Sequence, residues 1–123
     1  ILKPSKKYLN VKDANGKTAL HWAVILDKPF LVHYLLKKGA NVDVRSREGL
    51  TPLMIACRGH YCDKPIDCRY DIVKELVEFN ANYKLKFNDV DTAVDFAKAT
   101  DEYNDDNSSN VYLFMKRHFN LYD

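Results

Sequence analysis

Two short stretches that resemble each other decide the fold of this chain: GKTALHWAV (Gly16–Val24) and GLTPLMIAC (Gly49–Cys57). Their threonines, Thr18 and Thr51, lie 33 residues apart. Apolar residues within both stretches fall at the spacing of an α-helix. Self-similarity at a fixed period of this size indicates a repeat protein, in which each unit buries its apolar face against the next one.

A weaker third copy, VDTAVDFAK (Val90–Lys98), places Thr92 at a distance of 41 residues from Thr51. Each copy is followed by a second apolar stretch, which predicts two helices per unit. These second stretches are FLVHYLLKKGANVD (30–43), YDIVKELVEFNAN (70–82) and NVYLFMKRHFN (110–120).

Local signals agree with helices in these places. Thr18, Thr51 and Thr92 precede the first helices, where a hydroxyl can cap free backbone N–H groups. Pro52 suits a first helical turn. Gly39 follows two lysines, which predicts the end of a second helix. The pairs Asn15-Gly16 and Glu48-Gly49 stand where a tight turn must reverse the chain.

The period of 33, the sequences TALHWA and TPLMIA, and a second helix that ends in LLKKGA together resemble ankyrin repeats. The resemblance covers nearly the whole chain. It implies an all-α solenoid of stacked helix-turn-helix repeats with β-hairpin-type connecting loops. We expect a tail of a preceding repeat at 1–12, a repeat at 13–45, a repeat at 46–86 with an inter-helix insertion at about 58–69, and a divergent C-terminal repeat at 87–123 that acts as a cap.

Some positions depart from this pattern. The third copy has Val90 where the turn glycine should be, Ala93 for proline and Asp95 for histidine. At the other end, a shift of 33 pairs Leu9 with Val42 and Asn10 with Asp43, as a preceding repeat would require. We therefore expect the chain to be a fragment of a longer protein.

All three cysteines lie in CRGHYCDKPIDC (Cys57–Cys68), together with His60. Cys57 aligns with Val24 on a first helix, where a free cysteine behaves as a small apolar residue. Cys57 is therefore expected in the core. His60 aligns with a residue that often ends the first helix in the family, so we expect a capping role for it.

Three interpretations remain for Cys62 and Cys68. Structural zinc needs four ligands, usually in closely spaced pairs, and the spacing C-x5-C has no second pair in this chain. A disulfide would close a small loop, which a reducing compartment disfavours. The third interpretation is a solvated loop anchored by an apolar residue such as Ile66. No base and orienting partner are visible for a catalytic cysteine.

Composition limits the remaining functions. The net charge of +2 is too small to indicate nucleic-acid binding, and the apolar runs are too short to span a bilayer. An odd number of cysteines disfavours a secreted disulfide framework, so we expect an intracellular protein, cytoplasmic or nuclear. Residues 1–40 carry eight lysines against two aspartates, whereas residues 87–110 carry seven acidic residues against one lysine.

In such a stack, hairpin tips and first helices form a concave surface that binds other proteins. The resemblance therefore implies a non-enzymatic, monomeric protein–protein recognition module without a cofactor or metal, in a larger scaffold, regulator or effector, the last acting in a host cell. His21 is expected to be structural, and Trp22 to be either packed or an anchor. The expected contact residues are Asn15, Lys17, Trp22, Ile25, Leu26, Arg47, Glu48, Leu50, Arg58, Asn88, Asp89 and Asp91. Alternatives are a metal- or redox-responsive module that uses Cys62 and Cys68, or a targeting arm fused to an enzyme.

Overall fold

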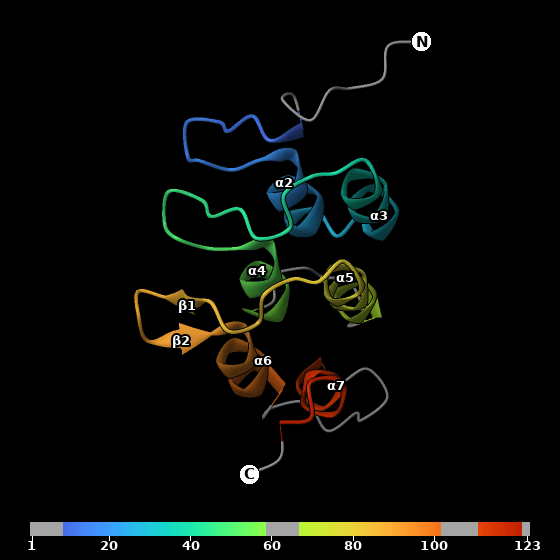
Figure 1. Cartoon of the computed structure of the whole chain (residues 1–123), viewed down its shortest axis with the longest axis vertical. Helices are drawn as coiled ribbons and strands as arrows, with labels where there is room; N and C mark the ends of the chain where they lie inside the picture. The colour runs from blue at the N-terminus through green and yellow to red at the C-terminus, as the bar shows by residue number, and fades with distance from the viewer. Residues whose placement is uncertain (1–8, 59–66, 102–110, 122–123) are drawn as a thin grey trace.

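A computed structural model of the chain describes residues 9–58, 67–101 and 111–121. These residues form three consecutive helix pairs. The pairs stack from the N-terminal to the C-terminal end, with hairpin loops on one side and the second helices on the other (Figure 1). The predicted all-α solenoid with hairpin-type loops is confirmed. The elements are α2 (Ala19–Ile25), α3 (Pro29–Lys37), α4 (Pro52–Arg58), α5 (Asp67–Glu78), β1 (Lys86–Phe87), β2 (Asp91–Thr92), α6 (Ala93–Asp101) and α7 (Val111–His118).

The second helices end alike. Gly39, Asn80 and Asn120 all have positive φ angles, of 102°, 63° and 56°. At each end, two successive N–H groups donate back to carbonyls of the last turn, as Gly39 does to Leu36 at 3.1 Å and Ala40 to Leu35 at 3.0 Å. Only glycine and, less often, asparagine adopt this left-handed conformation readily. The predicted stop at Gly39 is confirmed.

The connecting loops also repeat. Gly16 and Gly49 have φ angles of 71° and 93°, and their N–H groups donate to Asp13 and Ser46 at 2.9 Å. The third loop is a true hairpin, in which Lys86 pairs with Thr92 and Phe87 with Asp91. It lacks a glycine, and Asn88 and Asp89 take the left-handed conformation instead, at 48° and 59°. Val90 is therefore compatible with a turn at this place.

His21 is buried and joins the first repeat to the second. Its Nδ1 accepts the backbone N–H of Thr18 at 3.0 Å, and its Nε2 lies 2.9 Å from the Leu50 carbonyl. Since an N–H only donates and a carbonyl only accepts, the ring is neutral with its proton on Nε2. In the third repeat, the Asp95 carboxylate accepts the Thr92 N–H at 3.0 Å and so replaces this histidine.

The core runs through all three helix pairs. Small residues lie where first helices approach each other, and Ala23, Ala56 and Ala97 are all buried. Cys57 is fully buried with its Sγ 3.4 Å from the sulfur of Met115, which confirms its place in the core. Deep burial at these positions transfers apolar surface out of water, which is the main stabilising contribution.

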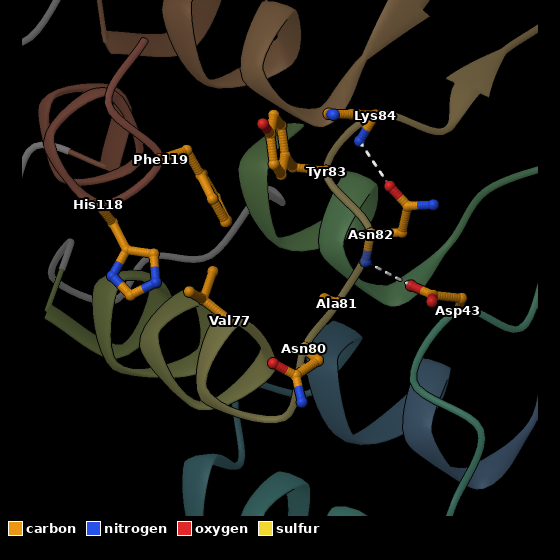
Figure 2. A pocket seen from close by; sticks show the side chains of 9 residues that line it. All are labelled: Asp43, Val77, Asn80, Ala81, Asn82, Tyr83, Lys84, His118 and Phe119. Carbon is orange, nitrogen blue, oxygen red and sulfur yellow. Dashed lines mark hydrogen bonds between the residues drawn. The ribbon is translucent and has the colours of Figure 1, made fainter.

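Polar side chains connect successive repeats at equivalent positions. Asn10 Oδ1 accepts the Asn41 N–H at 2.9 Å, and Asp43 Oδ1 accepts the Asn82 N–H at 2.8 Å (Figure 2). Residues 9–12 therefore meet the first repeat as residues 42–45 meet the second. This geometry supports the proposal that the N-terminal segment is the tail of a preceding repeat.

One expected boundary is corrected. The loop predicted at 58–69 is shorter at its C-terminal end, because α5 already begins at Asp67. Cys68 and Arg69 are therefore helical, and Arg69 Nε donates to the Ala56 carbonyl at 2.8 Å. That contact fixes the start of α5 against the end of α4. Residues 59–66, with His60, Cys62 and Ile66, lie outside the described residues.

Replacing the two turn glycines, Gly16 and Gly49, by alanine should destabilise the fold to different extents. A Cβ on Gly16 would lie 2.6 Å from the Arg47 nitrogen, whereas one on Gly49 would meet only Phe87 at 3.9 Å. Both changes to alanine incur about 1–2 kcal/mol for the left-handed conformation. We expect Gly16→Ala to lower the free energy of unfolding by about 1 kcal/mol or more beyond Gly49→Ala. Urea denaturation followed by circular dichroism measures both, and equal losses would contradict the close hairpin contact.

His21 predicts a loss of stability in mild acid. Burial lowers the pKa of His21 below its ordinary value of 6.5, while the Leu50 carbonyl acts in the opposite direction. Above pH 6.5, the contribution of neutral His21 to the free energy of unfolding is fully present. Below pH 6.5, His21 binds a proton in the unfolded chain but not in the folded chain. The free energy of unfolding therefore falls by up to about 1.4 kcal/mol per pH unit.

The measurement is urea denaturation at several pH values between 7.5 and 5, on the wild type and on His21→Gln. The variant keeps the other three histidines, which cancel in the comparison. We expect a shallower pH dependence in the variant. Identical slopes would show that His21 titrates normally in the fold.

Candidate binding face

The expected concave surface corresponds to one side of the stack, which we call the hairpin face. It consists of the three loop tips, at 13–17, 46–50 and 88–91, of the exposed residues of α2 and α6, and of Arg58 at the end of the otherwise buried α4. The tips lie on the same side of the stack (Figure 1). The tips stack on one another, since the Arg47 N–H donates to the Asn15 carbonyl at 2.9 Å. Rigid tips of this kind hold their side chains in fixed relative positions.

Most of the expected contact residues are accessible on this face. Exposed and partly exposed side chains occur on all three tips. Exposed are Asn15, Trp22, Leu26, Arg47, Glu48, Arg58, Asn88 and Asp89, and partly exposed are Lys17, Ile25 and Asp91.

Leu50 is placed differently from the expectation. Its side chain is 5% exposed and belongs to the core, and its carbonyl is the partner of His21. The residue after the turn glycine points inward, since the chain must return to the stack there. Leu50 is therefore a core residue that does not project from the tip, and only its remaining exposed surface lines a hollow below it.

Ile25 is corrected in part. Ile25 and Leu26 are both expected contact residues, but Ile25 packs against the core while Leu26 is 55% exposed. Ile25 instead lines a hollow of about 150 Å³ beneath the first two tips. The hollow has an apolar floor of Ile25, Leu50 and Ile55 and a charged rim of Lys17, Glu48 and Arg58. Its size suits a single side chain of a partner.

Asp13 holds Trp22 at the edge of this face. Asp13 Oδ2 accepts the indole N–H of Trp22 at 2.9 Å, while Oδ1 accepts the N–H groups of Asn15 and Lys17, both at 2.9 Å. The Lys17 ammonium lies 5.1 Å from the centre of the indole ring. Trp22 thus has a fixed orientation and remains 40% exposed.

The same hydrogen bonds act on the Asp13 carboxyl. Above all the Lys17 N–H, and next the Trp22 indole, lower the pKa of Asp13 below its ordinary value. The sequence analysis did not single out Asp13. An aspartate three residues before a turn glycine was the available signal, because its carboxylate can accept the N–H groups of the turn.

The exposure of Trp22 has a structural explanation too. A shift of 33 pairs Trp22 with Ile55, which is only 2% exposed in the second repeat. In the same way exposed Val11 pairs with buried Val44. Since these counterparts are buried within the stack, both explanations of Trp22, packing and anchoring, stay open.

The metal- or redox-responsive alternative depends on Cys62 and Cys68. Cys62 and the side chain of Cys68 lie outside the described residues, so neither form of this alternative is tested. Within 9–58, 67–101 and 111–121, no group of three or more His, Cys, Asp and Glu residues is arranged to hold a metal ion. In those same ranges, no helix has the length and apolar character needed to cross a membrane.

A further hollow, of about 600 Å³, lies between the ends of α5 and α7 (Figure 2). Tyr83 stacks on Phe119 with ring centres 3.9 Å apart, and His118 packs edge-on against Phe119. The Asp43 carboxylate on its wall is already engaged by the Asn82 N–H. This hollow carries no assembled catalytic group.

Comparison with known proteins identifies the family. A family model described as "Ankyrin repeats (3 copies)" matches residues 1–89. The chain is 36% identical to "Ankyrin repeat protein 14" of Vaccinia virus (strain Western Reserve), over 68% of this chain and 39% of that protein. It is 32% identical to "Ankyrin repeat domain-containing protein OPG023" of Cowpox virus (strain Brighton Red), over 99% of this chain and 19% of that protein.

A cellular protein is similar over a shorter range. The chain is 45% identical to "NF-kappa-B inhibitor alpha" of Gallus gallus over 42% of this chain and 16% of that protein. The chain therefore spans at most about two fifths of the length of these relatives.

Asp13 predicts an acid transition in the emission of Trp22, the only tryptophan. The pKa of Asp13 is lowered in the folded chain, so its carboxylate stabilises the loop and holds Trp22 fully above pH 3.8. This stabilisation is lost as the pH falls through the folded pKa. We expect a shift in tryptophan emission in that range, before the loss of helical circular dichroism. In Asp13→Asn the emission should already be shifted at pH 7 and should lack the transition. Asp89→Asn is the matched control, and an effect equal to that of Asp13→Asn would contradict the assignment.

Proposed function

The chain belongs to the ankyrin repeat family, and we propose that its hairpin face binds another protein. Ankyrin repeats are generally protein–protein interaction modules rather than enzymes. One similar protein is named as an inhibitor of NF-kappa-B, and that name describes action on another protein. The family indicates the kind of function, whereas the partner must be inferred from the face itself.

The hollow beneath the first two tips is the observation that carries this proposal. An apolar floor inside a charged rim offers burial for one partner side chain and hydrogen bonds around it. Leu26 adds exposed apolar surface at the end of α2. Apolar anchors surrounded by polar groups are typical of the energetic centres of protein interfaces.

The charges on the three tips would orient a bound partner. Asp13 and Lys17 lie on the first tip, Arg47 and Glu48 on the second, and Asp89 and Asp91 on the third. The face thus runs from two tips of mixed charge to an acidic third tip. Complementary charge sets the orientation and the association rate of a partner more than its affinity. We infer a partner segment that carries both signs of charge where it meets the first two tips and is basic where it meets the third.

The proposed context is a larger protein. The chain covers only a minor part of each relative described above, so the partner-binding module would serve a scaffold, regulator or effector. We propose that the module is monomeric and acts inside a cell, cytoplasmic or nuclear, which would be a host cell for an effector. A targeting arm fused to an enzyme is compatible with the same binding face.

The test is an affinity capture from cell lysate with two matched variants. The first changes the hairpin face: Leu26→Ser, Arg47→Ala, Glu48→Ala and Asp89→Ala. The second variant changes other exposed residues on the second helices and their ends: Leu31→Ser, Lys37→Ala, Lys38→Ala and Arg117→Ala. All eight side chains are exposed, so both variants should fold, which circular dichroism checks.

We expect a protein that wild type and the second variant retain and the first variant loses at least tenfold. Each lost contact at an energetic centre contributes about 1–2 kcal/mol, so three or four changes suffice for that loss. Equal capture by all three proteins would overturn the proposed face.

A further inference from the structure

Phe30 on α3 is 92% exposed, the highest value among the large hydrophobic residues of the described chain. Aligning the left-handed residues Gly39 and Asn80 pairs Phe30 with Asp71 of α5. Asp71 is exposed although the first repeat is in place beside it. The same alignment through Asn120 pairs Phe30 with Val111 of α7, which is buried, so this position differs between repeats. Beside α5, a preceding repeat leaves the equivalent residue uncovered, and stacking alone does not require an aromatic ring there.

A hollow of about 600 Å³ lies beside Phe30, between α3 and α5. We call it the back groove. Pro29, Phe30 and His33 line it from α3, and Asp71, Glu75 and Glu78 line it from α5. The two helices are direct neighbours in the stack, on the side opposite the hairpin loops (Figure 1). The back groove is therefore separate from the hairpin face.

The acidic side of the groove carries three carboxylates and one lysine, so it is only partly neutralised. Glu75 Oε2 lies 2.8 Å from His33 Nδ1, a hydrogen bond that is an ion pair only when His33 is protonated. Lys74 also lines the groove, but its ammonium lies 5.5 Å from the centre of the Tyr70 ring. Asp71 and Glu78 thus present carboxylates beside an exposed aromatic ring.

The spacing of these carboxylates defines the partner. Asp71, Glu75 and Glu78 stand at positions i, i+4 and i+7 of α5, so they form one row about 10 Å long. A helix with lysine or arginine at the same spacing would match this row. Apolar side chains one position further around that helix would meet Pro29 and Phe30.

We propose that the back groove binds a basic amphipathic helix of a partner protein. The apolar face of that helix packs on Pro29 and Phe30, and its cations face Asp71, Glu75 and Glu78. Exposed apolar surface rimmed by charge is typical of interaction sites, and helix-in-groove recognition uses anchors at these spacings. The inference is independent of the function proposed for the hairpin face.

The probe is a fluorescent synthetic helical peptide with lysines at i, i+4 and i+7 and leucines beside them. One control peptide has glutamates for the lysines, and another has serines for the leucines. Fluorescence anisotropy gives the affinity, and amide chemical shifts of ¹⁵N-labelled protein locate the site. We expect the basic peptide to bind at least tenfold more tightly than either control, with shifts in α3 and α5.

Three protein variants complete the design. Phe30→Ser and the pair Asp71→Asn with Glu78→Gln should each weaken binding at least tenfold. Leu26→Ser on the hairpin face should leave it unchanged. Absence of binding, or shifts confined to the hairpin loops, would overturn the proposal. Sedimentation showing that the protein dimerises through Phe30 would also overturn it, because a second copy would then occupy the groove.

Discussion

The stack depends on hydrogen bonds that cross from each repeat to the next at equivalent positions. Lys12 Nζ donates to the Arg45 carbonyl at 3.1 Å, and Arg45 Nη1 donates to the Lys86 carbonyl at 2.9 Å. The bonds from Asn41 to Asn10 and from Asn82 to Asp43 recur in the same way. Apolar burial alone is non-directional, so these polar contacts fix the register in which the repeats meet. That register determines how the residues of neighbouring repeats are placed on both candidate surfaces.

The fold was predictable because the repeat leaves several independent signals in the sequence. The period, the threonine before each first helix and Gly39 at a helix end all indicate the same structure. The third repeat is weak in sequence because it reaches the same geometry with other residues. Asp95 accepts the hydrogen bond that His21 accepts in the first repeat, and Asn120 takes the left-handed conformation of Gly39. Different residue types can thus supply the same hydrogen-bond acceptor or the same φ angle, and an alignment of residue types does not show this.

The candidate site was predictable only in outline. The loop tips were located correctly from their turn residues, but the direction of each side chain was not. Leu50 turns inward because the chain re-enters the core directly after Gly49, and Ile25 packs inward at the last turn of α2. Asp13 escaped notice because its role depends on three donors that converge only in the folded loop. Phe30 escaped notice because an apolar residue in an amphipathic helix is expected to be buried.

Comparison between repeats separates two causes of exposure. Val11, Trp22 and Leu31 are exposed, but their counterparts Val44, Ile55 and Ile72 are buried. For these residues, the absence of a further described repeat on the N-terminal side would account for the exposure without a binding partner. The counterpart of Phe30 in α5, Asp71, stays exposed beside the first repeat, whereas the counterpart in α7, Val111, is buried. At 92% exposure, the ring of Phe30 contributes almost nothing to packing within the described stack. Exposed apolar surface without an architectural role is the kind that binding accounts for. By this criterion Phe30 is better evidence of a binding surface than Trp22.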